Sequence, residues 1–541
     1  MPRVLIADKL ESAGVELLKS EGIEVETRLG LKGPELAAAL REFDAAIVRS
    51  VPKVTAAELE SPGKLRAIAR AGVGVDNIDV TAATRKGIVV MNTPGGNTVS
   101  AAEHTIALLL AVARRVPAAD AVMKAGGWDR NKFVGTQVAG KTLGVIGLGR
   151  IGREVARRAK GLDMKVVAFD QFVTAAKMAE LGYEASAGID EMLPKVDFLT
   201  VHVPGGAETK SMIGARELAL MKPTARVLNV ARGGVIDEAA LAEAVTKGTI
   251  AGAGIDVFTA EPTTPENPLL KAPNVVLTPH LGASTTEAQE NVAVEAAQLI
   301  ADFLLRGQVA NAVNMAAVNP AELAEVRPFV DLARRLGLMQ AQLAQGSIRR
   351  AALTYKGDLA SKKTKLLTAA FTAGMLEYHG IEGVNLVNAE VMATERGIEL
   401  SESSNPKKGD FAALISTEVE TDQGTRTAAG TLFGDQYLRL VQLGEFRMEG
   451  YLDGLMLVFT HRDVPGLIGF VGTIFGSHGV NIAQMIVGRK SATAGGDAIG
   501  ILNLDSSPSE EALAEVRAHP HIRNLMLVKL PPAGESPAWL G

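Results

Sequence analysis

The sequence predicts an α/β protein that is built from several domains. Much of the first 300 residues alternates short apolar runs with helical stretches rich in Ala, Leu and Glu, which is typical of parallel sheets covered by helices. One of the turns between an apolar run and a helix is rich in glycine. The 541 residues also exceed what a single hydrophobic core supports, so we expect three or four domains.

The composition excludes several classes of site. The chain is 47% hydrophobic and 22% charged, as expected of a globular protein. A net charge of −5 predicts neither a nucleic-acid partner nor an anionic membrane surface. The absence of cysteine excludes disulfides, thiolate metal sites and cysteine nucleophiles, and the histidine spacing suggests no metal site. With neither a signal-peptide pattern nor a membrane-spanning run, we expect a cytoplasmic protein.

The stretch Lys141 to Asp170 predicts a strand, a tight turn, a helix and a second strand. Gly147, Gly149 and Gly152 have the G-x-G-x-x-G spacing, which allows a sharp turn, close approach of a pyrophosphate and close helix packing. The free N–H groups of the helix start would face the phosphates. Asp170 follows Gly152 at the distance suited to the ribose hydroxyls, and no arginine follows it for a 2′-phosphate. We therefore predict a Rossmann-type domain that binds NAD.

The first 98 residues predict an open parallel sheet. The expected strands are Val4–Ala7, Ala45–Val48, Leu65–Ala69 and Ile88–Met91, and the expected helices are Glu11–Ser20, Pro34–Glu42 and Thr55–Glu60. Ligands of such sheets bind beyond the carboxyl ends of the strands. Four residues there are candidates to bind an anionic substrate: Arg49, Ser50, Arg70 and Asn97. For any one of them, a solvated loop residue is an equally good interpretation.

Residues 99–284 are expected to form the NAD-binding domain. A long helix is predicted over Thr98 to Lys124, followed by a segment with Trp128 and Phe133 beside basic residues. That segment suits a subunit contact or a local lid, and the sequence favours neither. The later strands are expected at Phe198–Val201, Val227–Val230, Gly254–Val257 and Val275–Leu277.

A helix from Thr285 to Arg306, ended by Gly307, is expected to return the chain to the first sheet. The substrate domain would then be discontinuous, with residues 1–98 and 285–314 on either side of the inserted NAD-binding domain. The active site would lie in the cleft between these two domains.

Residues 315–450 carry no catalytic constellation. We expect a helix from an N-cap at Asn319 to Gln345 and mostly strands from Phe411 to Tyr451. A packed spacer domain is the favoured interpretation. A regulatory anion site at Lys362, Lys363 and Lys365 is a less favoured one, because charge runs are usually solvated.

Residues 451–541 predict a compact βαββαβ unit with a ferredoxin-like order. Its expected elements are strands Leu455–Thr460, Val480–Arg489, Ala498–Leu504 and Arg523–Leu530 and helices Pro465–Ser477 and Pro508–Ala518. Nothing in it suggests catalysis, so a small-ligand or pairing role is more natural.

Three residues of the NAD-binding domain suit hydride-transfer chemistry. Arg232, Glu261 and His280 each follow a predicted strand, so all three should lie at one edge of the sheet. His280 can remove the hydroxyl proton of a 2-hydroxy acid, Glu261 can fix its ring, and Arg232 can bind the carboxylate. Singly, each could be structural; together, downstream of the glycine turn, they favour a catalytic set.

Several motifs resemble the D-2-hydroxyacid dehydrogenase family. GLGRIG, NVARGGVID, DVFTAEP and TPHLGAST match it, and RAGVGVDNID and NTPGGNTVSAAEHT resemble its D-3-phosphoglycerate dehydrogenase group. HRDVPGLIGFVGTIFGSHGVNI resembles the start of an ACT domain, and the stretch before it resembles the intervening domain of the long form of these enzymes. The resemblance covers essentially the whole chain, and it implies a flavodoxin-like substrate domain and an α+β intervening domain.

The resemblance implies NAD-dependent oxidation of 3-phospho-D-glycerate to 3-phosphohydroxypyruvate, the first step of L-serine biosynthesis. The family's catalytic residues fall on Arg232, Glu261 and His280, and its substrate contacts on Arg49, Ser50, Arg70 and Asn97. Its cofactor contacts fall on Arg150, Ile151, Asp170, Val230, Ala231, Arg232, Asp256 and the turn His280, Leu281, Gly282 and Ala283, with the backbone near Val73 and Val203. Relatives often carry Thr at the last two positions.

The resemblance also implies a homodimer or homotetramer, paired through the NAD-binding domains and often through the ACT domains. Relatives bind L-serine as an inhibitor at the ACT interface, where Asp463 and Asn481 match the binding positions. His461 stands where relatives have another residue.

Two other functions fit the sequence less well. The substrate could be another D-2-hydroxy acid, such as lactate, glycerate or 2-hydroxyglutarate, although paired Arg49 and Arg70 favour a doubly anionic one. The chain could instead be a non-catalytic NAD-sensing scaffold, although an intact Arg-Glu-His set argues against this. The C-terminal third could also be purely structural.

Overall fold

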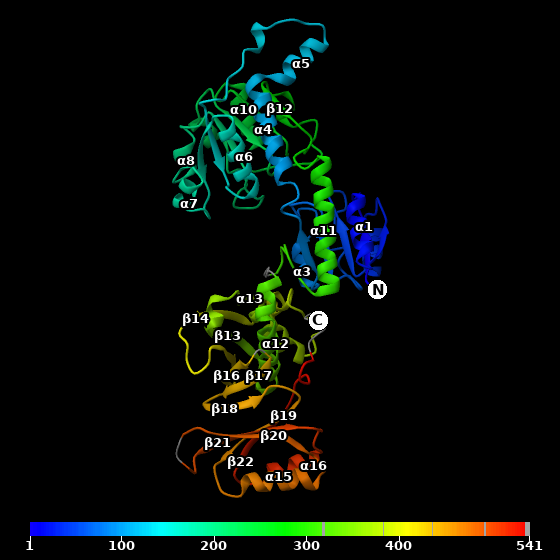
Figure 1. The fold of residues 1–541 in the computed structure, drawn as a ribbon, viewed down its shortest axis with the longest axis vertical. Helices are drawn as coiled ribbons and strands as arrows, with labels where there is room; N and C mark the ends of the chain where they lie inside the picture. The colour runs from blue at the N-terminus through cyan, green and yellow to red at the C-terminus, as the bar shows by residue number, and fades with distance from the viewer. Residues whose placement is uncertain (316–319, 382, 435, 492–493, 536–541) are drawn as a thin grey trace.

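Four sheets follow one another along an elongated molecule (Figure 1). The computed structural model describes residues 1–315, 320–381, 383–434, 436–491 and 494–535. None of the helices in these ranges is long and apolar enough to cross a membrane. The mixed α/β class predicted from the sequence is confirmed.

The first sheet has five parallel strands in the order β2-β1-β3-β4-β5, which is the flavodoxin-like order. Its strands are β1 Arg3–Ile6, β2 Glu24–Thr27, β3 Ala45–Val48, β4 Ala67–Arg70 and β5 Val89–Asn92. Helices α1 Ser12–Ser20, α2 Gly33–Glu42 and α3 Val80–Arg85 connect them. The long α11, Thr286–Arg306, packs against α1 and β4 and ends at Gly307 with a left-handed φ of 62°.

One expectation for this region was wrong, and one strand was missed. Residues Thr55 to Glu60 form turns and not a helix, because Glu58 accepts hydrogen bonds from the backbone and hydroxyl of Thr55 and closes a local turn. Strand β2 was not predicted. It is an edge strand of alternating Glu and small side chains, with no buried residue to mark it.

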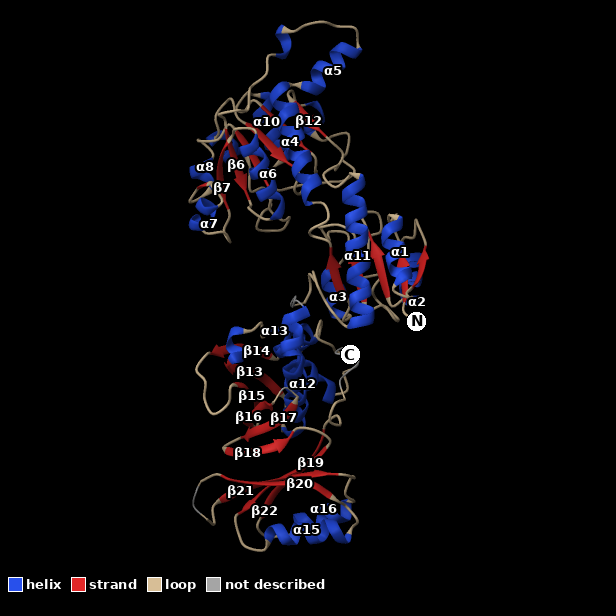
Figure 2. Cartoon of the chain, in the orientation of Figure 1, coloured by secondary structure: helices blue, strands red, loops and turns tan. Residues whose placement is uncertain are grey.

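The second sheet has seven parallel strands in the order β12-β11-β10-β9-β6-β7-β8, with helices on both faces (Figure 2). Its strands are β6 Thr142–Ile146, β7 Lys165–Phe169, β8 Glu184–Ala185, β9 Phe198–Val201, β10 Arg226–Asn229, β11 Gly252–Ile255 and β12 Val275–Leu277. Its helices are α4 Thr98–Arg114, α5 Val116–Lys124, α6 Arg150–Gly161, α7 Ala175–Glu180, α8 Ile189–Met192, α9 Ala215–Leu220 and α10 Glu238–Thr246, with short 3-10 turns at Asn131–Phe133 and Pro268–Lys271.

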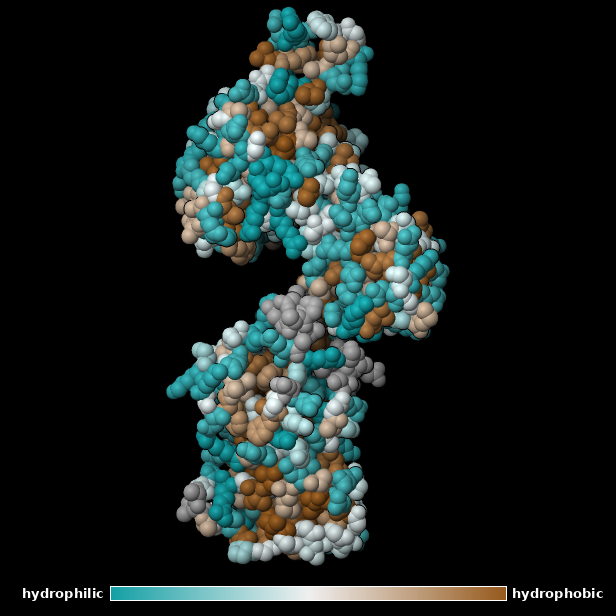
Figure 3. All heavy atoms as spheres, viewed as in Figure 1, coloured by the Kyte–Doolittle hydropathy of each residue, from teal (hydrophilic) through white to brown (hydrophobic). Residues whose placement is uncertain are grey.

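The helix expected from Thr98 to Lys124 is two helices. Arg115 adopts a left-handed φ of 55° between α4 and α5. α5 buries no residue, and it projects with the following loop at the top of Figure 1. Apolar side chains show on this projection in Figure 3, and exposed residues there are Val116, Met123, Trp128 and Val134.

The third sheet is mixed, in the order β14-β13-β15-β16-β17-β18. Its strands are β13 Ile348–Gly357, β14 Glu399–Asn405, β15 Ala413–Thr421, β16 Gly424–Phe433, β17 Tyr437–Leu443 and β18 Phe446–Tyr451. Its helices are α12 Pro320–Leu343, α13 Lys365–Tyr378 and α14 Ala389–Glu395, with a 3-10 turn at Asp358–Ser361. The predicted helix thus ends at Leu343 and not at Gln345, and its predicted cap, Asn319, lies outside the described residues.

The fourth sheet is antiparallel in the order β20-β21-β19-β22, with α15 and α16 on one face (Figure 2). Its elements are β19 Leu455–Arg462, α15 Leu467–Ser477, β20 Ile482–Arg489, β21 Asp497–Leu504, α16 Glu510–Arg517 and β22 Ile522–Lys529, so the predicted βαββαβ unit is confirmed. Its other face shares a hydrophobic core with the third sheet, because Met448 belongs to the same buried cluster as Val458 and Ile499. The third and fourth sheets therefore pack as one body.

Candidate active site

Three adjacent strands present the predicted catalytic residues. Arg232 follows β10, Glu261 follows β11 and His280 follows β12, and these strands are neighbours in the sheet. Parallel strands end at one edge, so the three side chains gather there, as the spacing predicted.

Glu261 and His280 form a close pair. Nδ1 of His280 lies 2.6 Å from Oε2 of Glu261, and Oε1 of Glu261 accepts the Phe258 N–H at 2.9 Å. Partial burial raises the pKa of Glu261, but the hydrogen bonds from His280 and Phe258 outweigh it, and the net pKa is lowered. An ionised Glu261 keeps the ring proton on Nδ1, which leaves Nε2 free to act as a base.

A buried carboxylate holds the loop that carries His280. Asp256, with no exposed side-chain surface, accepts the Leu281 and Gly282 N–H groups at 2.8 and 2.9 Å and the Thr278 hydroxyl at 2.5 Å. Nε2 of His104 lies 3.1 Å from the same carboxylate. The Asp256 backbone carbonyl accepts the His280 N–H at 2.8 Å, so this network fixes His280 in its left-handed φ of 55°. The sequence assigned His104 no such role; it lies on α4, remote in the chain.

Arg232 reaches across to the first sheet. Its Nε lies 3.3 Å from Asp76 Oδ2, and a methyl group added at Gly74 would overlap its guanidinium. The buried Asn229 holds the turn, because its amide donates to the Arg232 carbonyl at 2.9 Å and accepts the Ala231 N–H at 3.0 Å. Arg232 therefore stands where the two sheets face each other.

The predicted substrate arginines converge on the same place. The pKa of Arg70 falls to about 10, mainly because its side chain is buried and next because the charge of Arg232 lies close by. Arg49 adds to the shift and Asp76 opposes it. Asp8 also opposes the shift, so three guanidinium groups stand against two acids, and this excess of positive charge favours an anionic ligand.

Two atoms of the predicted substrate residues are buried without a partner among the described residues: Nε of Arg70 and the side-chain oxygen of Asn97. Such atoms cost free energy unless a ligand binds them. Ser50 is exposed at the end of the same strand region.

The glycine turn has room for a dinucleotide. Gly147 adopts a φ of 92°, and a methyl group there would lie 2.5 Å from the His202 carbonyl oxygen; one at Gly152 would overlap the Gly147 carbonyl. A methyl group at Gly149 would face open space, at the N-terminus of α6. The turn is therefore shaped for close approach of phosphates to the backbone, as NAD requires.

The remaining predicted cofactor residues surround that turn. Asp170 Oδ2 accepts the Leu148 N–H at 2.7 Å, so this carboxylate also braces the loop. Val203 lies beside Gly147, and Val230 lies beside Gly282. Arg150 is exposed at the first turn of α6, and its guanidinium lies near Gly95. Ile151 packs partly into the core, and Ala283 is half-buried.

Sequence comparisons agree with this geometry. Models of protein families match residues 106–282 as the NAD-binding domain of D-isomer-specific 2-hydroxyacid dehydrogenases, residues 325–444 as the D-3-phosphoglycerate dehydrogenase intervening domain, and residues 455–521 as an ACT domain. The D-3-phosphoglycerate dehydrogenase of Archaeoglobus fulgidus is 42% identical over 95% of this chain and 97% of its own. The chain belongs to the D-3-phosphoglycerate dehydrogenase family. It is an NAD-dependent dehydrogenase, as the sequence predicted.

Further relatives extend the comparison. The Synechocystis D-3-phosphoglycerate dehydrogenase is 42% identical over 98% of this chain and 95% of its own. Among solved structures, a Thermus thermophilus protein is 36% identical with a TM-score of 0.53, covering 57% of this chain and 99% of that one. A glyoxylate reductase from Paecilomyes thermophila is 28% identical with a TM-score of 0.53, covering 58% of this chain and 98% of that one.

The predicted effector residues lie elsewhere, in the fourth sheet. Asp463 forms an ion pair with Arg489 at 2.8 Å, and Asn481 donates to Asp505 at 2.6 Å. His461 is buried on β19, with Nδ1 at 2.8 Å from the Arg462 carbonyl. Both candidate effector side chains therefore already have partners within the subunit.

Other predicted polar features are structural. Lys362 forms an ion pair with Glu325. This pairing argues against the less favoured interpretation of the lysine cluster as an anion site. His202 is half-buried as a residue with its ring turned inward, and desolvation of the ring lowers its pKa to about 4, which keeps it neutral. No group of three metal-ligating side chains occurs within the described ranges.

Proposed function

We propose that this enzyme oxidises 3-phospho-D-glycerate to 3-phosphohydroxypyruvate and thereby supplies L-serine biosynthesis. The observation that carries the proposal is the proximity of Arg49, Arg70 and Arg232, with Arg232 following the strand next to the one that Glu261 follows, at the sheet edge that also carries the His280–Glu261 pair. The substrate carries a carboxylate at one end and a phosphate at the other, and three guanidinium groups match both. The names of the relatives above support the same substrate.

The proton is removed by His280. Its Nε2 takes the proton of the substrate hydroxyl while Nδ1 remains hydrogen-bonded to Glu261. The carboxylate of Glu261 stabilises the imidazolium that forms, because opposite charges attract more strongly where water is partly excluded. NAD, when bound, would accept the hydride that leaves carbon 2 of the substrate.

Arg232 orients the substrate and stabilises the product. Its guanidinium can bind the substrate carboxylate through two parallel hydrogen bonds and polarise the new carbonyl oxygen. Asp76 lies 3.3 Å from Nε, and Nη1 donates to the Ala231 carbonyl at 2.7 Å with one of its two hydrogens, so Nη2 and the second Nη1 hydrogen remain for this role. Arg70 and Asn97, with their unpartnered buried atoms, would bind the phosphate end together with Arg49 and Ser50.

Substrate specificity tests the proposal. We expect NADH to form from 3-phosphoglycerate, with much lower turnover from D-lactate, D-glycerate or D-2-hydroxyglutarate. Arg70→Lys should raise the KM for 3-phosphoglycerate and leave turnover of D-lactate unchanged, because lactate has no phosphate. Equal turnover of D-lactate and 3-phosphoglycerate would contradict the assignment.

We further propose that the enzyme is a homodimer or homotetramer and that L-serine inhibits it at Asp463 and Asn481. The exposed apolar side chains of the α5 projection, with Trp128 at 76% exposure, support a subunit contact there. L-serine would have to displace the Asn481–Asp505 hydrogen bond to bind. Unchanged serine inhibition in Asn481→Ala would count against this site, and a monomeric mass in light scattering would contradict the assembly.

A further inference from the structure

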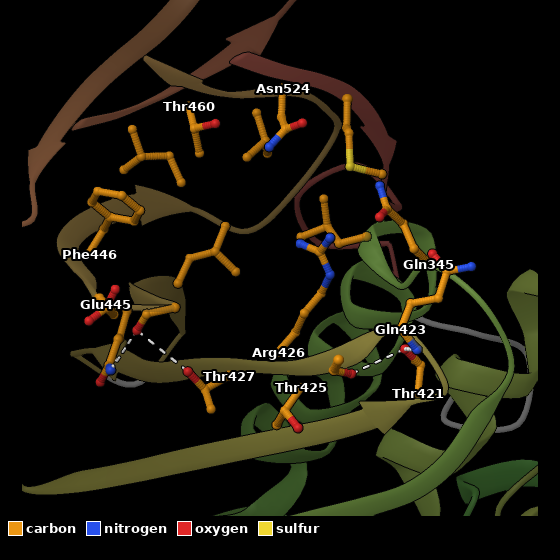
Figure 4. A pocket seen from close by; sticks show the side chains of 18 residues that line it. Gln345, Thr421, Gln423, Thr425, Arg426, Thr427, Glu445, Phe446, Thr460 and Asn524 are labelled. Carbon is orange, nitrogen blue, oxygen red and sulfur yellow. Dashed lines mark hydrogen bonds between the residues drawn. The ribbon is translucent and has the colours of Figure 1, made fainter. Parts of the chain in front are cut away.

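A cavity of about 590 Å³ lies between the third and fourth sheets (Figure 4). Strands β16, β17 and β18 contribute one wall, and β19, β21 and β22 contribute the other. None of the predicted dehydrogenase or serine residues lines it. Its volume falls within the range of small-molecule sites.

One cation projects into this cavity. Arg426 extends from β16 toward β19 and β22 (Figure 4) and is half-buried. Within the described ranges we find neither an ion pair nor a hydrogen bond to its guanidinium. The acid at the cavity rim, Glu445, pairs with Lys490 instead. A partly desolvated guanidinium without an acid is unfavourable, so the cavity favours an anion.

The other lining groups define the rest of the ligand. Gln423, Thr460 and Asn524 also line the cavity and provide amide and hydroxyl groups (Figure 4). Phe446 and Met526 provide apolar surface. A fully polar anion such as phosphate would leave this apolar surface without contacts, whereas a carboxylate on an apolar body would cover it.

We propose that this cavity binds a small organic carboxylate with an apolar body, held by a two-bond contact between its carboxylate and Arg426. The planar guanidinium matches a carboxylate in this geometry. Because the walls come from both sheets, the bound ligand contacts the intervening and ACT domains together. It therefore stabilises their packing, which is ordinarily maintained by the shared core around Met448.

The proposal is tested by calorimetric titration of the full-length enzyme with sodium hexanoate and, separately, with its neutral analogue hexanamide. We expect one hexanoate per chain and at least about tenfold weaker binding of hexanamide, because the charge-assisted bonds are lost. Arg426→Gln should reduce hexanoate binding to the hexanamide level, and Arg426→Lys should retain part of it. Arg447→Gln is the matched control, since Arg447 lies on β18 with 85% exposure and outside the cavity.

Hydrogen–deuterium exchange locates the site. Hexanoate should slow exchange in peptides covering residues 423–427 and 524–526 in the wild type and in Arg447→Gln, but not in Arg426→Gln. The dehydrogenase turnover and thermal midpoint of Arg426→Gln without hexanoate should equal those of the wild type, which shows that it folds. Absence of saturable hexanoate binding, equal binding by Arg426→Gln, or protection confined to other peptides would overturn the proposal.

Discussion

Replacing Glu261 with Gln tests the assigned base most directly. The amide keeps the shape of the side chain, but one of its two ends is now a donor. If its oxygen still accepts the Phe258 N–H, its NH₂ faces Nδ1 of His280, which must then give up its proton. The ring proton moves to Nε2, the atom that should receive the substrate proton.

The alternative orientation is also unfavourable. The amide oxygen would then accept from Nδ1, and the NH₂ would face the Phe258 N–H, which costs about 1–3 kcal/mol for an unsatisfied donor. Loss of the carboxylate removes a further charge-assisted hydrogen bond of about 1.5–3 kcal/mol. Since Glu261 and His280 are 37% and 49% exposed, we take the lower part of these ranges, about 3 kcal/mol in total. That corresponds to a fall in kcat of about a hundredfold.

Initial rates of NADH formation at 340 nm with saturating 3-phosphoglycerate measure this effect. The affinity for NAD should not change, because Glu261 contacts His280 and the Phe258 backbone. Glu266→Gln makes the same chemical change at an exposed position of the same loop and should keep wild-type kcat. A fall of less than about threefold in Glu261→Gln would refute the role of this pair in holding the ring proton.

Three further predictions concern the cofactor turn, the buried acid and the C-terminal body. Gly149→Ala should fold normally but weaken NAD binding at least about tenfold by titration, whereas Gly161→Ala, also facing open space, should bind NAD normally. Asp256 has a lowered pKa, because its hydrogen bonds outweigh the effect of its burial. Its ionised form therefore stabilises the fold above about pH 4, and this stabilisation is lost at lower pH. The difference in thermal midpoint between the wild type and Asp256→Asn should be largest at pH 7 and should shrink toward pH 3. Arg335→Met should lower the thermal midpoint of the C-terminal body by at least about 5 °C in calorimetry. The fully buried Arg335 of α12 pairs with Asp331 at 2.9 Å and donates across to the backbone carbonyls of Leu452 and Pro531 in the last domain; an unchanged midpoint would contradict this.

The local patterns of the sequence predicted much of the fold. Strands Ala45–Val48 and Phe198–Val201 were predicted to the residue, because strands buried on both faces are continuous apolar runs. Elements without such a pattern were missed or misplaced. Strand β2 lies at an edge and is polar, and the break at Arg115 depends on a single left-handed residue inside an otherwise helical pattern.

The candidate site divides in the same way. The positions of Arg232, Glu261 and His280 after three strands were evident in the sequence, because each follows its own short apolar run. The order of those strands, and therefore their adjacency, was an expectation that only the sheet could establish. The assigned roles of these residues remain proposals that the variants above test.

The sequence by itself determined the fold class, the glycine turn and the family, because each depends on residues close together in the chain. The tertiary structure decided what requires distant segments to meet. It joined His104 of α4 to Asp256, brought Arg232 to Asp76 in the loop after β4, and placed Arg426 in the cavity between two sheets. Such contacts depend on the packing of whole sheets and helices, and a charged or polar side chain in a sequence carries no local signal of which distant partner it will face.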